Sequence, residues 1–186
     1  MMSVIICPSP VNIATGILIA KETLISDVST SEPELVMKNL PKLVSIYSGG
    51  TDSKTFLNPE IITLENMPLL TDVTLPDKAF RWREKVTLNN LSTLDSIQLG
   101  SGAFCFAPGS EEENSTLIMR NLMRLTAIRA VSKKSSDTSC FVNVKRVTFE
   151  NLPSLSTIVL PKCSFKSRTV LETKNISQRL SQFLNV

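Results

Sequence analysis

Apolar and polar residues alternate in short runs along most of the chain, and runs of similar form recur. Each recurrence contains an asparagine, at Asn39, Asn66, Asn90, Asn121, Asn151 and Asn175. Four and two residues before the first five of these asparagines the chain is apolar, and polar residues such as Thr63 and Thr87 lie between. This period of two is typical of a strand with one buried face. The pattern therefore predicts a strand before each of these asparagines.

A second set of apolar positions follows the asparagine. Leucine, methionine or isoleucine stands one residue after it, leucine stands four residues after it in five units, and a branched residue stands seven residues after it, as at Ile46, Val73 and Ile97. The residue nine positions after it is leucine in Leu75, Leu99 and Leu160. Each unit thus predicts a second short strand beyond a tight turn. Since two strands cannot bury these faces alone, we expect successive units to stack as parallel coils around one core.

The spacing of the asparagines predicts how the chain is divided. Consecutive asparagines are 27, 24, 31, 30 and 24 residues apart, which indicates a constant unit with insertions of different length. We expect a degenerate N-terminal repeat or cap in residues 1–33, a solenoid of five repeats in residues 34–165, and a degenerate or truncated final repeat in residues 166–186. A further coil also fits Ile17, Ile19 and Leu24.

The final repeat departs from the spacing of the others. Leu180 and Phe183 follow Asn175 by five and eight residues instead of four and seven. We therefore expect an interrupted coil whose Ile176, Leu180, Phe183 and Leu184 lack a covering layer. An open apolar end of this kind predicts self-association, or pairing with the rest of a longer protein.

The run Leu155-x-x-Ile158-x-Leu160-x-x-Cys163-x-Phe165 resembles the leucine-rich-repeat consensus L-x-x-L-x-L-x-x-N/C-x-L. With Ala79-Phe80 and Ala103-Phe104 at the same place in earlier units, the chain resembles the irregular BspA-like, or treponemal, subclass. The resemblance implies a β-rich solenoid, a right-handed coil stack with two short parallel strands per repeat and little helix. It also implies protein binding, in a cell-surface or host-contact role. The consensus corner residue is replaced by Lys78 and Gly102, so a regular ladder is not expected there.

Leucine-rich repeats often bind ligands through the outward residues of the second strand. In this chain the expected central row reads Leu18, Tyr47, Thr74, Gln98, Arg129 and Val159, and Ser45, Asp72, Ser96, Ala127 and Thr157 lie beside it. We take Tyr47, Asp72, Thr74, Gln98, Arg129 and Val159 as the candidate protein-binding residues. Tyr47 and Arg129 are the favoured anchors, because aromatic and arginine side chains are enriched at interface hot spots. An ordinary solvated sheet face remains the alternative.

Composition argues against several classes of function. The chain has no histidine, which excludes Ser-His-Asp and Cys-His catalysis and histidine-ligated metals. The only carboxylates near the expected outward row are Asp72 and Asp95, too few and too scattered for a glycosidase pair. We therefore expect no enzyme activity and no cofactor. A net charge of +3 with scattered basic residues argues against nucleic acid as a partner.

Four cysteines, Cys7, Cys105, Cys140 and Cys163, show no metal-binding spacing, so we expect small buried residues. No apolar run is long enough to span a bilayer, and the N-terminal residues lack the pattern of a signal peptide. Together these features lean toward a cytoplasmic location. The sequons at Asn90, Asn114 and Asn175 would matter only in a secreted protein, and two of them coincide with the repeat asparagine.

Other surface features leave their role open. An acidic insertion, residues 107–115, and a basic insertion, residues 131–139, leave adjacent repeats, and Trp82 stands between two arginines. We expect a non-catalytic scaffold that binds a protein partner. The alternative is a purely structural solenoid segment, or a fragment of a longer repeat protein, with no ligand of its own.

Overall fold

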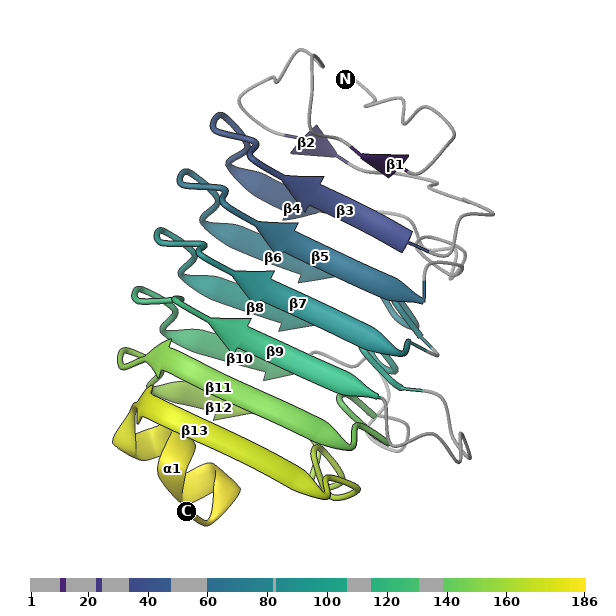
Figure 1. The fold of residues 1–186 in the computed structure, drawn as a ribbon, viewed down its shortest axis with the longest axis vertical. Helices are drawn as coiled ribbons and strands as arrows, with labels where there is room; N and C mark the ends of the chain where they lie inside the picture. The colour runs from purple at the N-terminus through teal and green to yellow at the C-terminus, as the bar shows by residue number, and fades with distance from the viewer. Residues whose placement is uncertain are drawn as a thin grey trace.

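The computed structural model describes residues 11–12, 23–24, 34–47, 60–81, 83–106, 115–130 and 139–186. These residues form a parallel β-solenoid in which two sheets face each other across one core (Figure 1). Successive strands along the chain alternate between the sheets, so each repeat before the last contributes one strand to each sheet.

The first sheet contains the strands that precede the repeat asparagines. These strands are β1 Val11–Asn12, β3 Glu34–Lys38, β5 Ile61–Glu65, β7 Lys85–Asn89, β9 Thr116–Arg120, β11 Arg146–Leu152 and β13 Val170–Ile176, adjacent in this order. The second sheet contains β2 Thr23–Leu24, β4 Ser45–Tyr47, β6 Asp72–Leu75, β8 Ser96–Leu99, β10 Ala127–Ala130 and β12 Thr157–Val159. All pairs are parallel, which confirms the expected strand-rich solenoid with two short strands per repeat and little helix.

The core consists of the apolar positions that the sequence pattern selected. In β7, for example, Val86 and Leu88 are buried, while Thr87 between them is half-buried on the outer face. Leu91 and Leu94 in the turn and Ile97 and Leu99 in β8 are buried as well. The predicted alternation is thus confirmed in β3, β5 to β9 and β11, where buried residues alternate with more exposed ones.

The repeat asparagine closes the turn between the two strands of each coil. Asn39, Asn66, Asn90, Asn121, Asn151 and Asn175 all have a left-handed backbone, with φ between 51° and 59°. Asparagine tolerates this conformation better than most residues with a Cβ atom. Its side-chain amide also donates a hydrogen bond to the asparagine of the preceding coil, as from Asn66 Nδ2 to Asn39 Oδ1 (3.0 Å) and from Asn90 Nδ2 to Asn66 Oδ1 (2.8 Å). The asparagines therefore have a structural role in shaping the turn.

Phenylalanine forms a second ladder at the opposite corner of the coil. Phe80, Phe104, Phe141 and Phe165 stack in order with ring centroids 5.4, 5.7 and 4.9 Å apart, and all four are buried. Each has a positive φ, and each follows a small buried residue, which is Ala79, Ala103, Cys140 or Ser164. A regular ladder does exist at this corner, but aromatic rings form it instead of the consensus asparagine or cysteine. The repeat spacing did not reveal Cys140-Phe141 as a member, since the insertion before it disturbs that spacing.

The C-terminal end corrects two expectations. Strand β13 pairs with β11 along its whole length, but the chain then forms α1, Gln178–Leu184, where a second strand was expected. Leu180 and Leu184 are 2 % and 1 % exposed, so the expectation that they lack a covering layer is wrong. Self-association through this end stays a prediction, without the uncovered leucines on which it was based.

The local sequence explains why α1 forms. Ile176, Leu180, Phe183 and Leu184 have the spacing of one helical face, so the apparent slip of the repeat is a change of period from two to 3.6. The Ser177 hydroxyl accepts the Leu180 N–H (3.1 Å) and caps the helix N-terminus. Arg168 donates to the Leu184 carbonyl (2.8 Å) and to the Phe165 carbonyl (3.0 Å), which ties the end of α1 to the corner of the last coil. Phe183 packs edge-on against Phe165 and continues the aromatic contacts into the helix.

The N-terminal coil has a different register from the expected one. Residues Thr23 and Leu24 of β2 pair with Ile46 and Tyr47 of β4, so Leu24 lies in the row where Leu18 was expected. Leu18 itself, with most of residues 1–33, lies outside the described residues. The match of three apolar positions was too weak to set the register.

Core and surface positions within β8 should respond differently to truncation. Ile97→Ala and Leu99→Ala should each lower the free energy of unfolding by about 2 to 4 kcal/mol, because both side chains are 1 % exposed and leave cavities. Gln98→Ala, at the exposed position between them, should cost less than about 1 kcal/mol. Urea unfolding followed by circular dichroism measures both. Equal losses at all three positions would contradict the assigned faces of the strand.

Asn90 allows the backbone and amide contributions to be separated. Asn90→Ala places a Cβ-bearing residue without a polar side chain at φ 54° and removes the bond to Asn66. Asn90→Gly removes the same bond but relieves the left-handed strain. We expect Asn90→Ala to be the less stable variant by about 1 kcal/mol in urea unfolding. If glycine is as damaging as alanine, the amide ladder and not the turn conformation is the dominant contribution.

Candidate functional site

The strands of the second sheet hold all the candidate binding residues. The pairing of strands places Tyr47 beside Thr74, Thr74 beside Gln98, Gln98 beside Arg129 and Arg129 beside Val159. Asp72 lies two residues before Thr74 on β6, in a parallel row with Ser45 and Ser96. The structure therefore brings these residues together in two adjacent rows that cross five strands.

The rows differ in chemistry along the solenoid. Asp72, Gln98 and Arg129 are exposed, Thr74 is half-buried, and Val159 is 53 % exposed. The Ser96 hydroxyl donates to Asp72 Oδ1 (2.8 Å), which orients that carboxylate on the surface. The carboxylate of Asp72 thus lies on β6, whereas the cationic Arg129 on β10 lies next to the exposed Val159 on β12. The described residues of the two rows thus combine a carboxylate, an amide, a guanidinium group and an exposed aliphatic side chain on one surface.

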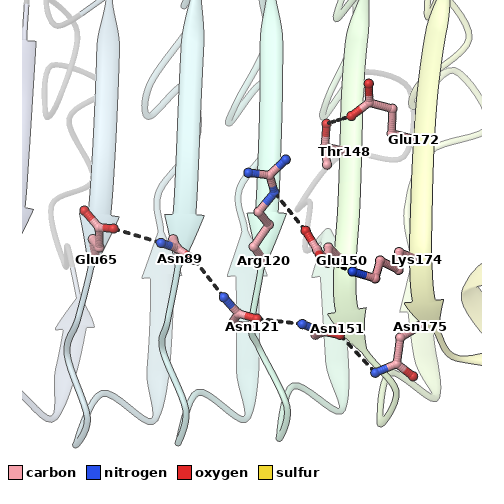
Figure 2. Close-up of polar contacts among 10 residues, drawn as sticks. All are labelled: Glu65, Asn89, Arg120, Asn121, Thr148, Glu150, Asn151, Glu172, Lys174 and Asn175. Carbon is pink, nitrogen blue, oxygen red and sulfur yellow. Dashed lines mark hydrogen bonds and ion pairs between the residues drawn. The ribbon is translucent and has the colours of Figure 1, made fainter.

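A second polar surface, on the outer face of the first sheet, was missed by sequence analysis. It consists of the residues just before the repeat asparagines, namely Lys38, Glu65, Asn89, Arg120, Glu150 and Lys174, which we call the charge row. Lys38 pairs with Glu65 (2.9 Å), and Asn89 donates to Glu65 (2.8 Å). Glu150 pairs with Arg120 (3.3 Å) and with Lys174 (3.1 Å), as Figure 2 shows. The alternation of charge at one repeat position was the signal in the sequence.

The charge row is coupled to the asparagine ladder at its centre. Asn121 Nδ2 donates to Asn89 Oδ1 (3.2 Å) and not to Asn90, so the ladder moves over to the charge row between β7 and β9 (Figure 2). Asn151 and Asn175 continue the ladder from Asn121, at 2.7 and 3.0 Å. The hydrogen bond from Lys38 and then the one from Asn89 lower the pKa of Glu65, which keeps this carboxylate ionised.

A shallow groove follows the turns of the first three repeats. Its volume is about 390 Å³. The lining residues are Asn39, Pro41, Asn66, Pro68, Asn90 and Ser92. The prolines lie in the turns, where a missing N–H costs no ladder bond, and this agrees with a structural role for them.

The cysteines gather near the phenylalanine corner. Cys105 and Cys140 are buried and Cys163 is half-buried, and no disulfide joins them. Burial raises the pKa of Cys140 to about 12, and the Cys105 thiol nearby adds to the shift. Burial also raises the pKa of Cys105, whose thiol donates to the Ser139 carbonyl (3.1 Å). The expectation of small buried residues is confirmed for Cys105 and Cys140, while Cys7 lies outside the described residues.

One arginine is buried between repeats. Arg83 is 1 % exposed, and burial lowers its pKa to about 10 although Glu60 opposes the shift. Its neighbour Trp82, whose role the sequence left open, lies outside the described residues, as does most of each insertion, 107–114 and 131–138. A cation held this deeply belongs to the solenoid interior and is not a surface anchor.

Two of the three sequons lie in the turns of the solenoid. Asn90 and Asn175 are turn residues with a left-handed backbone, and Asn114 lies outside the described residues. Across the described ranges, no group of three or more histidine, cysteine or acidic side chains could hold a metal ion. Within the same part of the chain, no helix is both long and apolar enough to cross a membrane.

No model of a known protein family matches this sequence, and comparisons with curated proteins and with solved structures also gave no match. The parallel β-solenoid is thus defined by the structure itself.

The buried thiols should be protected from alkylation. At pH 8 we expect iodoacetamide to modify Cys163 at least about tenfold faster than Cys140, because Cys140 is 0 % exposed and its thiolate is disfavoured. Peptide mapping by mass spectrometry measures the two alkylation rates. Similar rates in the folded protein would contradict the burial of Cys140.

The same burial makes stability depend on pH. The pKa of Cys140 in the folded protein lies above its ordinary value of 9.0, so the contribution of this thiol to the free energy of unfolding is fully present below pH 9 and falls as the pH rises toward 12.

Proposed function

We propose that this chain is a non-catalytic protein-binding scaffold and that the outer face of the second sheet is its contact surface. The observation that supports this most directly is the row Tyr47, Thr74, Gln98, Arg129 and Val159, which five adjacent strands hold in register. A solenoid with a continuous core holds such a row rigidly, so little conformational entropy is lost when a partner binds. Arg129 beside the exposed Val159 is the favoured centre of the contact.

The proposal includes a relationship to leucine-rich repeats of the irregular BspA-like type. Two features support it: the spacing that places Leu94, Ile97 and Leu99 in the core, and the small residue and phenylalanine at the next corner. A cell-surface or host-contact role is part of the same proposal and follows only from that resemblance.

The function can be tested by comparing two sets of surface variants in affinity capture from the source cells. The first set combines Tyr47→Ala, Gln98→Ala and Arg129→Ala on the second sheet. The control combines Thr63→Ala, Lys85→Ala and Thr87→Ala on the outer face of the first sheet. We expect the wild type and the control to recover the same partner proteins in similar amounts. The first set should recover about tenfold less of them or even lower amounts, because truncating a hot-spot residue costs about 2 kcal/mol of binding free energy.

Quantitative mass spectrometry of the captured proteins gives the readout, and circular dichroism confirms that both variants fold. Equal recovery by both sets would remove the second sheet as the contact surface. Capture of nothing above background by any form would favour the alternative of a purely structural solenoid segment.

A further inference from the structure

Among the described strands, β13 is an edge strand of the first sheet. β13 pairs with β11 on one side, and no described strand pairs with its other side. Helix α1 begins after Ser177, lies at the same end of the stack (Figure 1) and packs against β12 of the second sheet. Glu172, Thr173, Lys174 and Asn175 are all exposed. Thr173 occupies the inward position at which Phe149 of β11 is buried, so this end of the core has a polar residue.

Two ladders of polar contacts end at this edge. In the charge row, Lys174 pairs with Glu150 on one side, and its side chain is 76 % exposed. In the asparagine ladder, Asn175 donates Nδ2 to Asn151, and its Oδ1 lies on the side away from Asn151 (Figure 2). At Asn39, Asn66, Asn121 and Asn151 the corresponding oxygen accepts the amide of the following asparagine. The edge therefore offers a cation and an amide oxygen at adjacent residues.

The backbone adds a requirement on any strand that pairs here. All six repeat asparagines have a left-handed φ, so the chain bends at the same place in each of the six strands from β3 to β13. A neighbour can follow the bend of β13 at Asn175 only if it runs parallel and has a residue at that position that tolerates a positive φ. Asparagine meets this requirement and can also donate to Asn175 Oδ1.

We propose that the free edge of β13 binds an extended segment of another protein, aligned parallel to β13, that carries a Glu-Asn dipeptide. The glutamate carboxylate lies beside Lys174 and the asparagine amide lies beside Asn175. The chain itself provides the pattern twice, because Glu65-Asn66 and Glu150-Asn151 make these contacts with Lys38 and Asn39 and with Arg120 and Asn121. Strand addition of this kind gains backbone hydrogen bonds from the edge and specificity from the side chains.

A folded second copy of the chain does not supply such a segment from its described residues. The two Glu-Asn dipeptides lie in or at the ends of β5 and β11, and both strands already have neighbours on both sides. Two copies joined through their β13 edges would run antiparallel and place the bends at opposite ends of the pairing. The free side of β1 lies at the other end of this sheet, but its two residues, Val11 and Asn12, include no Glu-Asn dipeptide. Charge and amide complementarity to Lys174 and Asn175 therefore favours an unpaired segment of a different protein as the occupant.

The test uses a fluorescently labelled peptide with the sequence of residues 145–153, which contains Glu150-Asn151, and the whole chain as receptor. Fluorescence anisotropy should show saturable binding. We expect Lys174→Glu to weaken binding by at least about fivefold, because it replaces an ion pair with like charges. A peptide with Glu150→Lys should restore binding to the Lys174→Glu chain but bind the wild type poorly. Lys166→Glu, an exposed charge change outside the edge, is the matched control and should have no effect.

A peptide with Asn151→Val tests the bend, and its binding should be lost, since a branched residue resists a positive φ. Amide hydrogen exchange should slow at residues 172–175 when the unaltered peptide binds. No saturable binding, equal binding of all peptides, or protection on the second sheet instead would each overturn the proposal. So would dimerisation of the chain alone that Lys174→Glu abolishes, because the edge would then be occupied by a second copy.

Discussion

The left-handed turn at the repeat asparagine is the constraint on which the rest of the solenoid depends. A parallel stack can pair its backbone groups only if every coil bends at the same place and by the same amount. Asparagine tolerates the bend and carries both a donor and an acceptor on its side chain, so one residue type shapes the turn and can also bond to the asparagine of a neighbouring coil. The turns at Asn39 and Asn66, which are 27 residues apart, therefore match despite a longer connection between them.

At the opposite corner of each coil, buried phenylalanine rings occupy the sharp bend of the backbone. The four stacked phenylalanines also have positive φ, a strained conformation for a residue with a large side chain. Burial of the rings and their contacts with neighbouring rings stabilise this corner and offset the strain. A small residue precedes each ring, and all four of these residues are buried. One corner is thus polar and partly solvated, while the other is apolar and inside the core.

The two outer faces follow from this framework but differ in character. On the first sheet, neighbouring charges pair across strands, so most of the polar capacity is used within the molecule. On the second sheet, only Asp72 and Ser96 among the described row residues make a side-chain bond to one another, and Gln98, Arg129 and Val159 extend into solvent. A surface whose groups are not engaged internally loses less on binding, which supports the second sheet as the contact surface. At the end of the first sheet, Lys174 and Asn175 make the last ion pair and the last asparagine hydrogen bond of their rows. In our proposal, these two side chains recognise the bound segment by the same contacts that join neighbouring repeats.

By itself the sequence determined the strands, the faces they bury and the rows on the second sheet, because period-two alternation and a repeated asparagine depend on local geometry alone. Thr74, Gln98 and Arg129 align in one row simply because each follows its repeat asparagine by eight residues. Tertiary structure alone decided which strands lie at an edge, that the aromatic rings form a continuous stack, and that α1 closes the second sheet. The segment from Ser177 to Asn185 has a helical spacing, but so short a helix is not stable alone. It is stabilised by burying Leu180 and Leu184 against the core, which exists only after the coils have assembled. The hydrogen bond from Asn121 to Asn89 instead of Asn90 likewise depends on how side chains on neighbouring strands are oriented, which the spacing of residues along the chain does not predict.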